Sequence, residues 1–191
     1  MSKIAEEMFA LQLGKRYKIP TVAMRYSIVQ GSRQSFYNAY SGACRIFSLA
    51  FHQGKEPQIY EDGNQVRDFV NIHDVVDANL LVLEDERADY EMFNVGGGAP
   101  VTVNQFAIAC AKIYDIKNYQ PKPSGKYRFG DTRHIWSDIS KLESLGWKPS
   151  RTIYDSIAEY KEWLDCASSI DNIIEYCSKK MIELNVLRDV S

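Results

Sequence analysis

A helical pattern that leads directly into an apolar strand limits the possible folds of this chain more than any other sequence feature. In residues 4–17, apolar side chains recur every three to four positions, which is typical of one buried helix face. Pro20 ends that element, and residues 21–29 form a β-rich run of the length expected of a buried strand. Because strands preceded by helices favour parallel pairing, the pattern predicts an α/β protein.

Helical and strand patterns continue to alternate along the chain. Gly54 follows the second helical pattern as a natural left-handed cap, and Thr102 with Gln105 has the form of a capping box. We expect further helices at 43–52, 74–83, 103–114, 138–145 and 152–164, and strands at 58–60, 66–70 and 92–95. An apolar stripe predicts an additional helical stretch over residues 166–190, which packs on the body or mediates assembly.

Length, charge and cysteine content exclude several classes of protein. A chain of 191 residues corresponds to one domain or one and a fraction. The net charge of -2, with no long run of either sign, argues against nucleic-acid binding, which needs a basic face. No apolar run approaches the ~18–20 residues of a bilayer span. The four scattered cysteines suggest reduced thiols, and without a signal-peptide pattern we expect a cytoplasmic location.

Short motifs occur in the order and spacing of one known family. Over roughly residues 1–164 the chain resembles the second half of the extended short-chain dehydrogenase/reductases that act as NAD-dependent nucleotide-sugar epimerases and dehydratases, such as UDP- or dTDP-hexose 4-epimerases. Each motif alone is weak, but their order and spacing together are specific. The motifs are Ser2-Lys3, Arg25-Tyr26, 31–34, 60–63, 66–75, 93–98, 128–131, 138–141 and 145–147.

This resemblance implies a particular domain organisation. The chain would hold the C-terminal part of a Rossmann-type parallel sheet plus a small mixed α/β substrate-binding domain. Residues 1–36 would be the remnant of the Rossmann-type domain, to which residues 74–98 return. Residues 37–73 and 99–164 would form the substrate-binding domain, and residues 165–191 a C-terminal helical extension.

Two features of the family have no counterpart in these residues. A glycine-rich turn cradles the NAD pyrophosphate in the family, whereas Gly96–Gly98, the only glycine cluster here, precedes a capping box and favours an ordinary turn. The family's catalytic tyrosine would fall two positions ahead of Met1. We therefore expect a nucleotide-sugar-binding half that is inactive alone. The alternative is a non-enzymatic assembly or regulatory module derived from this fold.

The resemblance assigns Lys3 and Tyr26 to the cofactor. Lys3 would be catalytic, because its charge lowers the pKa of the family's tyrosine, and its ammonium would hydrogen-bond the nicotinamide ribose of NAD. Tyr26 would lie near the nicotinamide edge. The alternatives are a solvated lysine and a core aromatic. We expect no metal site, because His73, Asp77 and His134 suit a helix cap and a solvated face better.

Substrate binding would depend on arginines. A pyrophosphate carries two negative charges and needs forked donors, for which Arg67 and Arg128 are the candidates. Asp131, three residues after Arg128, would accept hydrogen bonds from the ribose. The alternative for Arg67 is a surface arginine paired with Asp62 or Asp68.

Four more residues complete the expected site by resemblance. Arg33 would lie in a loop that closes over the sugar nucleotide, and Gln58, Ile59 and Tyr60 would run along the base, with Ile59 or Tyr60 covering its face. Ile28 replaces an asparagine that many family members place near the phosphates, which leaves the substrate class open. Expected partners are a nucleoside-diphosphate sugar and either a second copy or an N-terminal half of the fold.

Overall fold

The computed structural model describes residues 2–35, 42–167 and 173–189. Residues 36–41, at the expected lobe boundary, and residues 168–172, in the expected extension, lie outside this description. The helices are α1 (Ser2–Tyr17), α2 (Ala43–His52), α3 (Ile72–Glu84), η1 (Glu86–Ala88), α4 (Val103–Ile113), α5 (Ser140–Glu143), α6 (Ile153–Asp165) and α7 (Ile173–Glu183). The strands are β1 (Ala23–Tyr26), β2 (Ile28–Gln30), β3 (Val66–Asn71), β4 (Met92–Val95), β5 (Pro100–Thr102), β6 (Lys126–Arg128) and β7 (Leu187–Asp189).

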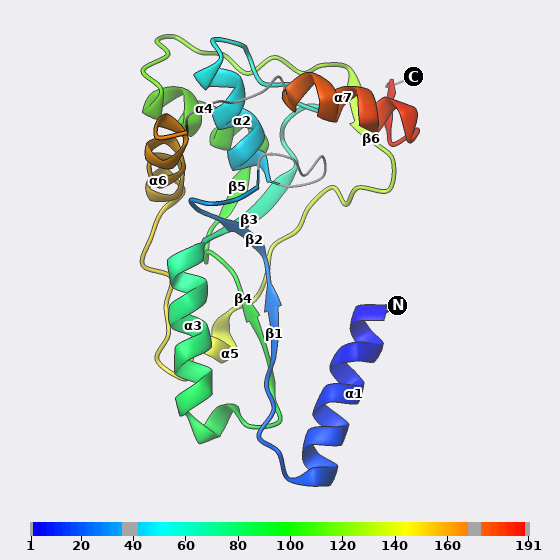
Figure 1. Ribbon diagram of the computed structural model, residues 1–191, viewed down its shortest axis with the longest axis vertical. Coiled ribbons are helices and arrows are strands. Elements are labelled where there is room, and N and C mark those ends of the chain that lie inside the picture. Colours follow the sequence, from blue (N-terminus) through cyan, green and yellow to red (C-terminus); the bar gives the residue numbers. More distant parts are fainter. Residues whose placement is uncertain (1, 36–41, 168–172, 190–191) are drawn as a thin grey trace.

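The α/β class is confirmed, but the single strand expected over residues 21–29 is two strands. β1 pairs in parallel with β4, and β2 pairs in parallel with β3, which is antiparallel to β5 (Figure 1). The chain changes partner at Ser27, whose N–H donates to the carbonyl of Val95 at 2.9 Å and whose hydroxyl donates to Asp68 at 2.7 Å. β propensity alone carries no signal for such a change of partner.

Two apolar clusters form the core. The first joins α2, α4 and α6 to one side of β3, where the rings of Phe69 and Phe106 lie 4.3 Å apart. The second joins α3 to β4 and includes Leu142 of α5, although the sequence places residues 99–164 with the substrate-binding lobe. The division into two lobes stays a prediction.

The buried face expected for α1 is wrong. Ile4, Met8, Phe9 and Leu13 are between 52% and 68% exposed, and α1 stands beside the body in Figure 1. Glu7 ties the helix to β1 by accepting two hydrogen bonds from Arg25, each of 2.6 Å. The helical period of apolar residues was correct, and Leu11 is buried at 6% exposure, but nothing in the described chain covers the other four side chains.

Three smaller expectations also need correction. Residues 58–60 contribute a single bridge, from Ile59 to Pro123, and the helix expected at 138–145 is the four-residue α5. The expected C-terminal helical extension ends in a strand, because β7 pairs antiparallel with β6. No helix in the described ranges is both long and apolar enough to cross a membrane.

Candidate functional site

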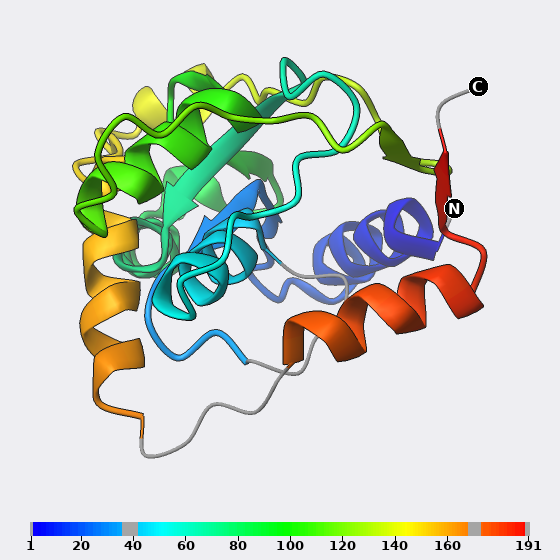
Figure 2. The ribbon, with the colours of Figure 1, turned by 90° about the horizontal axis from the view of Figure 1, so that it is seen from above.

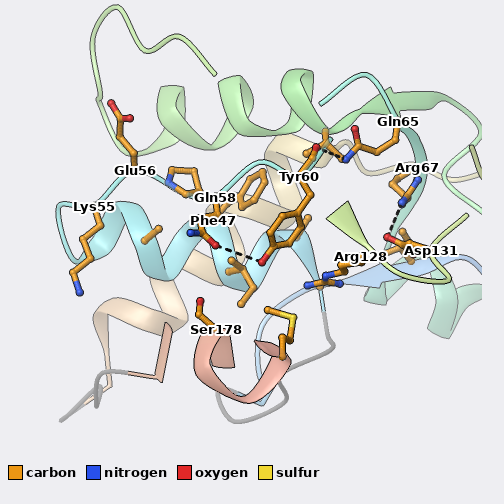
Figure 3. A pocket seen from close by; sticks show the side chains of 18 of the residues that line it. Phe47, Lys55, Glu56, Gln58, Tyr60, Gln65, Arg67, Arg128, Asp131 and Ser178 are labelled. Carbon is orange, nitrogen blue, oxygen red and sulfur yellow. Dashed lines mark hydrogen bonds and ion pairs between the residues drawn. The ribbon is translucent and has the colours of Figure 1, made fainter. Parts of the chain in front are cut away.

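A cavity of about 770 Å³ lies between α2, the segment 55–60, β3, β6 and α7 and is the candidate site (Figure 3). Its walls come from segments far apart in the sequence. The polar residues that line it are Lys55, Glu56, Gln58, Tyr60, Gln65, Arg67, Arg128, Asp131, Glu175, Ser178 and Lys179.

Both arginines expected at the pyrophosphate line this cavity, together with Asp131. Arg67 is 9% exposed and its guanidinium donates to the carbonyls of Val66 and Arg133 at 2.9 and 2.8 Å. Its second terminal nitrogen lies 3.2 Å from Asp131, so its partner is neither of the carboxylates considered from the sequence. Asp131 remains 41% exposed, which leaves oxygen atoms free to accept from a ligand.

Arg128 differs from Arg67 in having no counter-ion in the described part of the chain. It makes no ion pair with any residue in the described ranges, and its buried Nε has no hydrogen-bond partner there. The guanidinium carbon lies 5.2 Å from the centroid of the Tyr60 ring, which holds it by a cation–π contact (Figure 3). A cation with an unpartnered donor on a cavity wall favours an anionic ligand.

A neighbouring ion-pair group positions Arg67. Arg133 donates to Glu61 at 2.6 Å and to Asp62 at 2.7 Å, and its backbone carbonyl accepts from Arg67. These hydrogen bonds hold the pKa of Asp62 well below its usual value and raise that of Arg133. The loop after β6 is thereby fixed against the loop before β3, and Arg67 is held between them.

The other end of the cavity has an apolar wall from α2, and Lys55 and Glu56 also line it (Figure 3). Ile46, Phe47 and Ala50 of α2 line it, and Pro57 follows from the next loop. Gln58 supplies an amide there, whose oxygen lies 3.5 Å from the hydroxyl of Tyr60. A second amide, on the side of Arg67 in Figure 3, belongs to Gln65, which is 4% exposed and donates to the carbonyl of Tyr60, while its own oxygen has no partner among the described residues.

Four expected site residues lie outside the cavity walls. Ile59 is fully buried in the first core cluster, so Tyr60 is the one of the two that faces the cavity. Arg33 is exposed with a left-handed φ of 65°. Lys3 is 88% exposed and pairs with Glu6 on its own helix at 2.7 Å.

The last of these four, Tyr26, sits at the end of β1, apart from the cavity. It is 47% exposed, and its hydroxyl donates to Asn79 of α3 at 2.8 Å. The expected substrate residues therefore gather largely in one place, whereas the expected cofactor residues Lys3 and Tyr26 are elsewhere.

Sequence reasoning missed the wall that α7 provides. Glu175, Ser178, Lys179, Met181 and Ile182 all line the cavity. Among them, Glu175, Ser178 and Ile182 recur at intervals of three and four residues, which indicates a shared helix face but does not show what that face contacts. Ile28 also lines the cavity, which places the departure from the family motif at the site itself.

The glycine cluster after β4 is tightly packed. A Cβ on Gly97 would lie 1.8 Å from the carbonyl oxygen of Phe69, and the N–H of Gly97 donates to Asp68 at 2.7 Å. An amide already bonded to a buried carboxylate is a poor donor to phosphate, since the carboxylate repels it. This turn therefore does not fit a dinucleotide pyrophosphate.

The residues considered for a metal have separate partners. His134 accepts the N–H of Val66 at 3.2 Å, and Asp77 lies 3.4 Å from Arg151. Within the described ranges, no group of three or more His, Cys, Asp or Glu side chains could hold a metal ion.

Comparisons with known proteins agree with the motifs. The model of the NAD dependent epimerase/dehydratase family matches residues 1–96. The dTDP-L-rhamnose 4-epimerase of Burkholderia thailandensis is 34% identical over 85% of this chain and 45% of its own length. A putative UDP-glucose 4-epimerase of Methanocaldococcus jannaschii is 33% identical over 86% of this chain and 52% of its own. The chain thus spans about half the length of the curated relatives it matches.

Solved structures give the same result. The UDP-glucose 4-epimerase of Thermotoga maritima, crystallised with UDP-glucose, superposes with a TM-score of 0.76 at 33% identity, over 85% of this chain and 51% of the other. The UDP-glucose 4-epimerase of Thermus thermophilus in complex with NAD has a TM-score of 0.73 at 27% identity, over 85% and 52% of the two chains. By sequence and by fold, this chain belongs to the NAD dependent epimerase/dehydratase family.

Proposed function

We propose that this chain is the nucleotide-sugar-binding half of an NAD-dependent sugar-nucleotide epimerase or dehydratase. The observation that carries the proposal is the meeting of Arg67 and Arg128 in one cavity, although 60 residues separate them in sequence. Of the two, Arg128 has no counter-ion in the described chain. A diphosphate supplies the charge and the several acceptor oxygens that two guanidinium groups require.

Each cavity residue then has a role in binding. Arg128 takes the diphosphate first, because no carboxylate of the described residues pairs with it. Asp131, which is 41% exposed, can turn from Arg67 to accept the ribose hydroxyls and so free the second guanidinium for the ligand. The nucleoside lies over Tyr60 at the end lined by α2, where Gln58 reaches its edge. Because Ile28 has no side-chain amide, the arginines alone bind the diphosphate in this proposal.

We assign NAD to the whole protein and not to this cavity. When bound, NAD accepts and returns a hydride at the sugar carbon in this family. Lys3 and Tyr26 are proposed to face it, but the described residues offer no cradle for its pyrophosphate. We therefore expect this chain to bind nucleotide sugar without turning it over. Epimerisation of UDP-glucose by the purified 191-residue chain with added NAD would contradict this expectation.

Isothermal calorimetry with UDP-glucose and dTDP-glucose tests the proposed binding. We expect at least one of them to bind the unaltered chain, and Arg67→Ala to weaken it by about tenfold or more, because a charge-assisted bidentate contact contributes at least ~1.4 kcal/mol. Arg16→Ala, an exposed arginine on α1, is the matched control and leaves affinity unchanged. Absence of heat with both sugars, or equal affinities for the Arg67 variant and the unaltered chain, would refute the proposal.

The exposed apolar residues of α1 favour a second candidate, assembly with another polypeptide. Met8 and Phe9 are 61% and 68% exposed, an arrangement that water disfavours. A second copy or the complementary part of the fold would cover them. We expect light scattering to detect concentration-dependent association that Phe9→Glu reduces. A monomer at all concentrations would contradict this candidate and leave the nucleotide-sugar proposal intact.

A further inference from the structure

The segment from α7 to β7 lies beyond the family motifs, which end at Trp147, yet it forms one wall of the cavity. We call residues 173–189 the C-terminal strap. Figure 2 shows α7 leading into β7, which stands beside β6. The strap is therefore joined to the strand that carries Arg128.

The strap is attached at both ends. At one end, β7 pairs antiparallel with β6, the guanidinium of Arg188 stacks 3.8 Å from the centroid of the Phe129 ring, and Phe129 donates its N–H to the carbonyl of Val186 at 2.8 Å. At the other end, Glu175 lies 3.7 Å from Lys55. Met181 and Leu187 are 3% and 8% exposed. Buried anchors and a strand pairing indicate a fixed wall instead of a loose tail.

One face of α7 is directed at the cavity. Glu175, Ser178 and Ile182 recur at intervals of three and four residues, so they share a helix face, and all three line the cavity. Figure 3 shows Ser178 on the opposite side of the cavity from Gln58 and Tyr60. The strap therefore faces the end of the site lined by α2.

We propose that the C-terminal strap contacts the nucleoside of the bound nucleotide sugar and contributes to the choice of base, an inference that rests on the proposed function. A base is flat, with apolar faces and a polar edge, which suits the apolar groups of Met181 and Ile182 and the single hydroxyl of Ser178. Glu175 and Lys179 also line this wall; Glu175 lies 3.7 Å from Lys55, and Lys179 adds a donor for the polar edge of the base. The family motifs end at Trp147, so none of them includes this contact.

A matched pair of variants tests the contact. Ile182 and Leu184 are both exposed aliphatic residues, 55% and 51%, but only Ile182 lines the cavity. We expect Ile182→Asn to lower the affinity for UDP by about tenfold, because the apolar contact with the base is lost. The ratio of the UDP affinity to the GDP affinity should change as well. Leu184→Asn changes neither value. Neutral substitutions avoid repelling the diphosphate, and circular dichroism checks that both variants fold.

Hydrogen exchange of the unaltered chain with and without UDP gives an independent readout. The inference predicts slower amide exchange in residues 173–183 when UDP is bound. Protection of residues 58–60 and 126–131 without protection of the strap, or equal effects of the two variants, would overturn the strap inference and leave the proposed function standing. If UDP changes exchange nowhere and produces no heat, the proposed function fails and the inference fails with it.

Discussion

Asp68 is the residue whose replacement gives the sharpest prediction about the fold. Its carboxylate is fully buried on β3 and links three segments. One oxygen accepts the N–H of Gly97 at 2.7 Å, and the other accepts the N–H of Ser137 at 3.2 Å and the hydroxyl of Ser27 at 2.7 Å. Ser27 is the point where the chain passes from one sheet to the other, so Asp68 holds that crossing to the glycine turn.

Asp68→Asn keeps the shape and removes one acceptor. Whichever way the amide is turned, its NH2 group faces the part-buried backbone N–H of Gly97 or of Ser137 and cannot accept from it. Losing a hydrogen bond to a charged group and stranding its donor costs about 3 kcal/mol of unfolding free energy. That is a large part of the ~5–15 kcal/mol that stabilises a typical domain.

Urea unfolding followed by far-UV circular dichroism measures this loss. Glu162→Gln, the same acid-to-amide change at an exposed position of α6, is the matched control and should stay within ~0.5 kcal/mol. A loss below ~1 kcal/mol for Asp68→Asn, with the slope of free energy against urea unchanged, would show that the Asp68 bonds do not hold the three segments together.

Three further predictions concern packing, reactivity and pH. Gly97→Ala places a Cβ 1.8 Å from a β3 carbonyl and should lower the melting temperature far more than Gly54→Ala, whose Cβ meets nothing within 4 Å; equal shifts would contradict the packing. Burial raises the pKa of Cys44 to about 12, so mass spectrometry should find iodoacetamide on the exposed Cys166 well before Cys44. The hydrogen bond from Thr152 in the capping box lowers the pKa of Asp155 in the folded chain. The ionised carboxylate therefore stabilises the folded state at pH values above the pKa of Asp155 in the unfolded chain, and this stabilisation is lost as the pH falls through its pKa in the folded chain. Asp155→Asn should flatten the acid limb of the stability curve below about pH 4, and an unchanged limb would argue against this cap.

Local elements could be predicted because their causes are local. The capping box of Thr102 and Gln105 is present in both directions, and the helix it begins ends within one residue of the expected position. The alternation in residues 66–70 gave β3 within one residue. In such segments, the residues that fix the backbone are neighbours in sequence.

The site could be predicted only in part. The arginines were identified because a diphosphate needs forked donors and because the motifs resemble a family. By contrast, Arg67 pairs with Asp131, which is distant in sequence, and not with Asp62 or Asp68. The position of α7 at the cavity depends on the pairing of β7 with β6 at Leu187, which the apolar stripe of the helix does not predict. Likewise, the spacing of apolar residues in α1 predicts a helix with one apolar face, but the surface that covers this face cannot be predicted from the sequence of the helix.

The most direct test of the diphosphate assignment compares UDP with uridine, ligands that differ only in the diphosphate. Calorimetry on the unaltered chain should show UDP binding at least about tenfold more tightly than uridine. In Arg128→Gln that ratio should fall toward one while uridine affinity is retained, and in the control Arg16→Gln it should persist. Equal affinities for UDP and uridine in the unaltered chain, or an undiminished ratio in Arg128→Gln, would contradict the account.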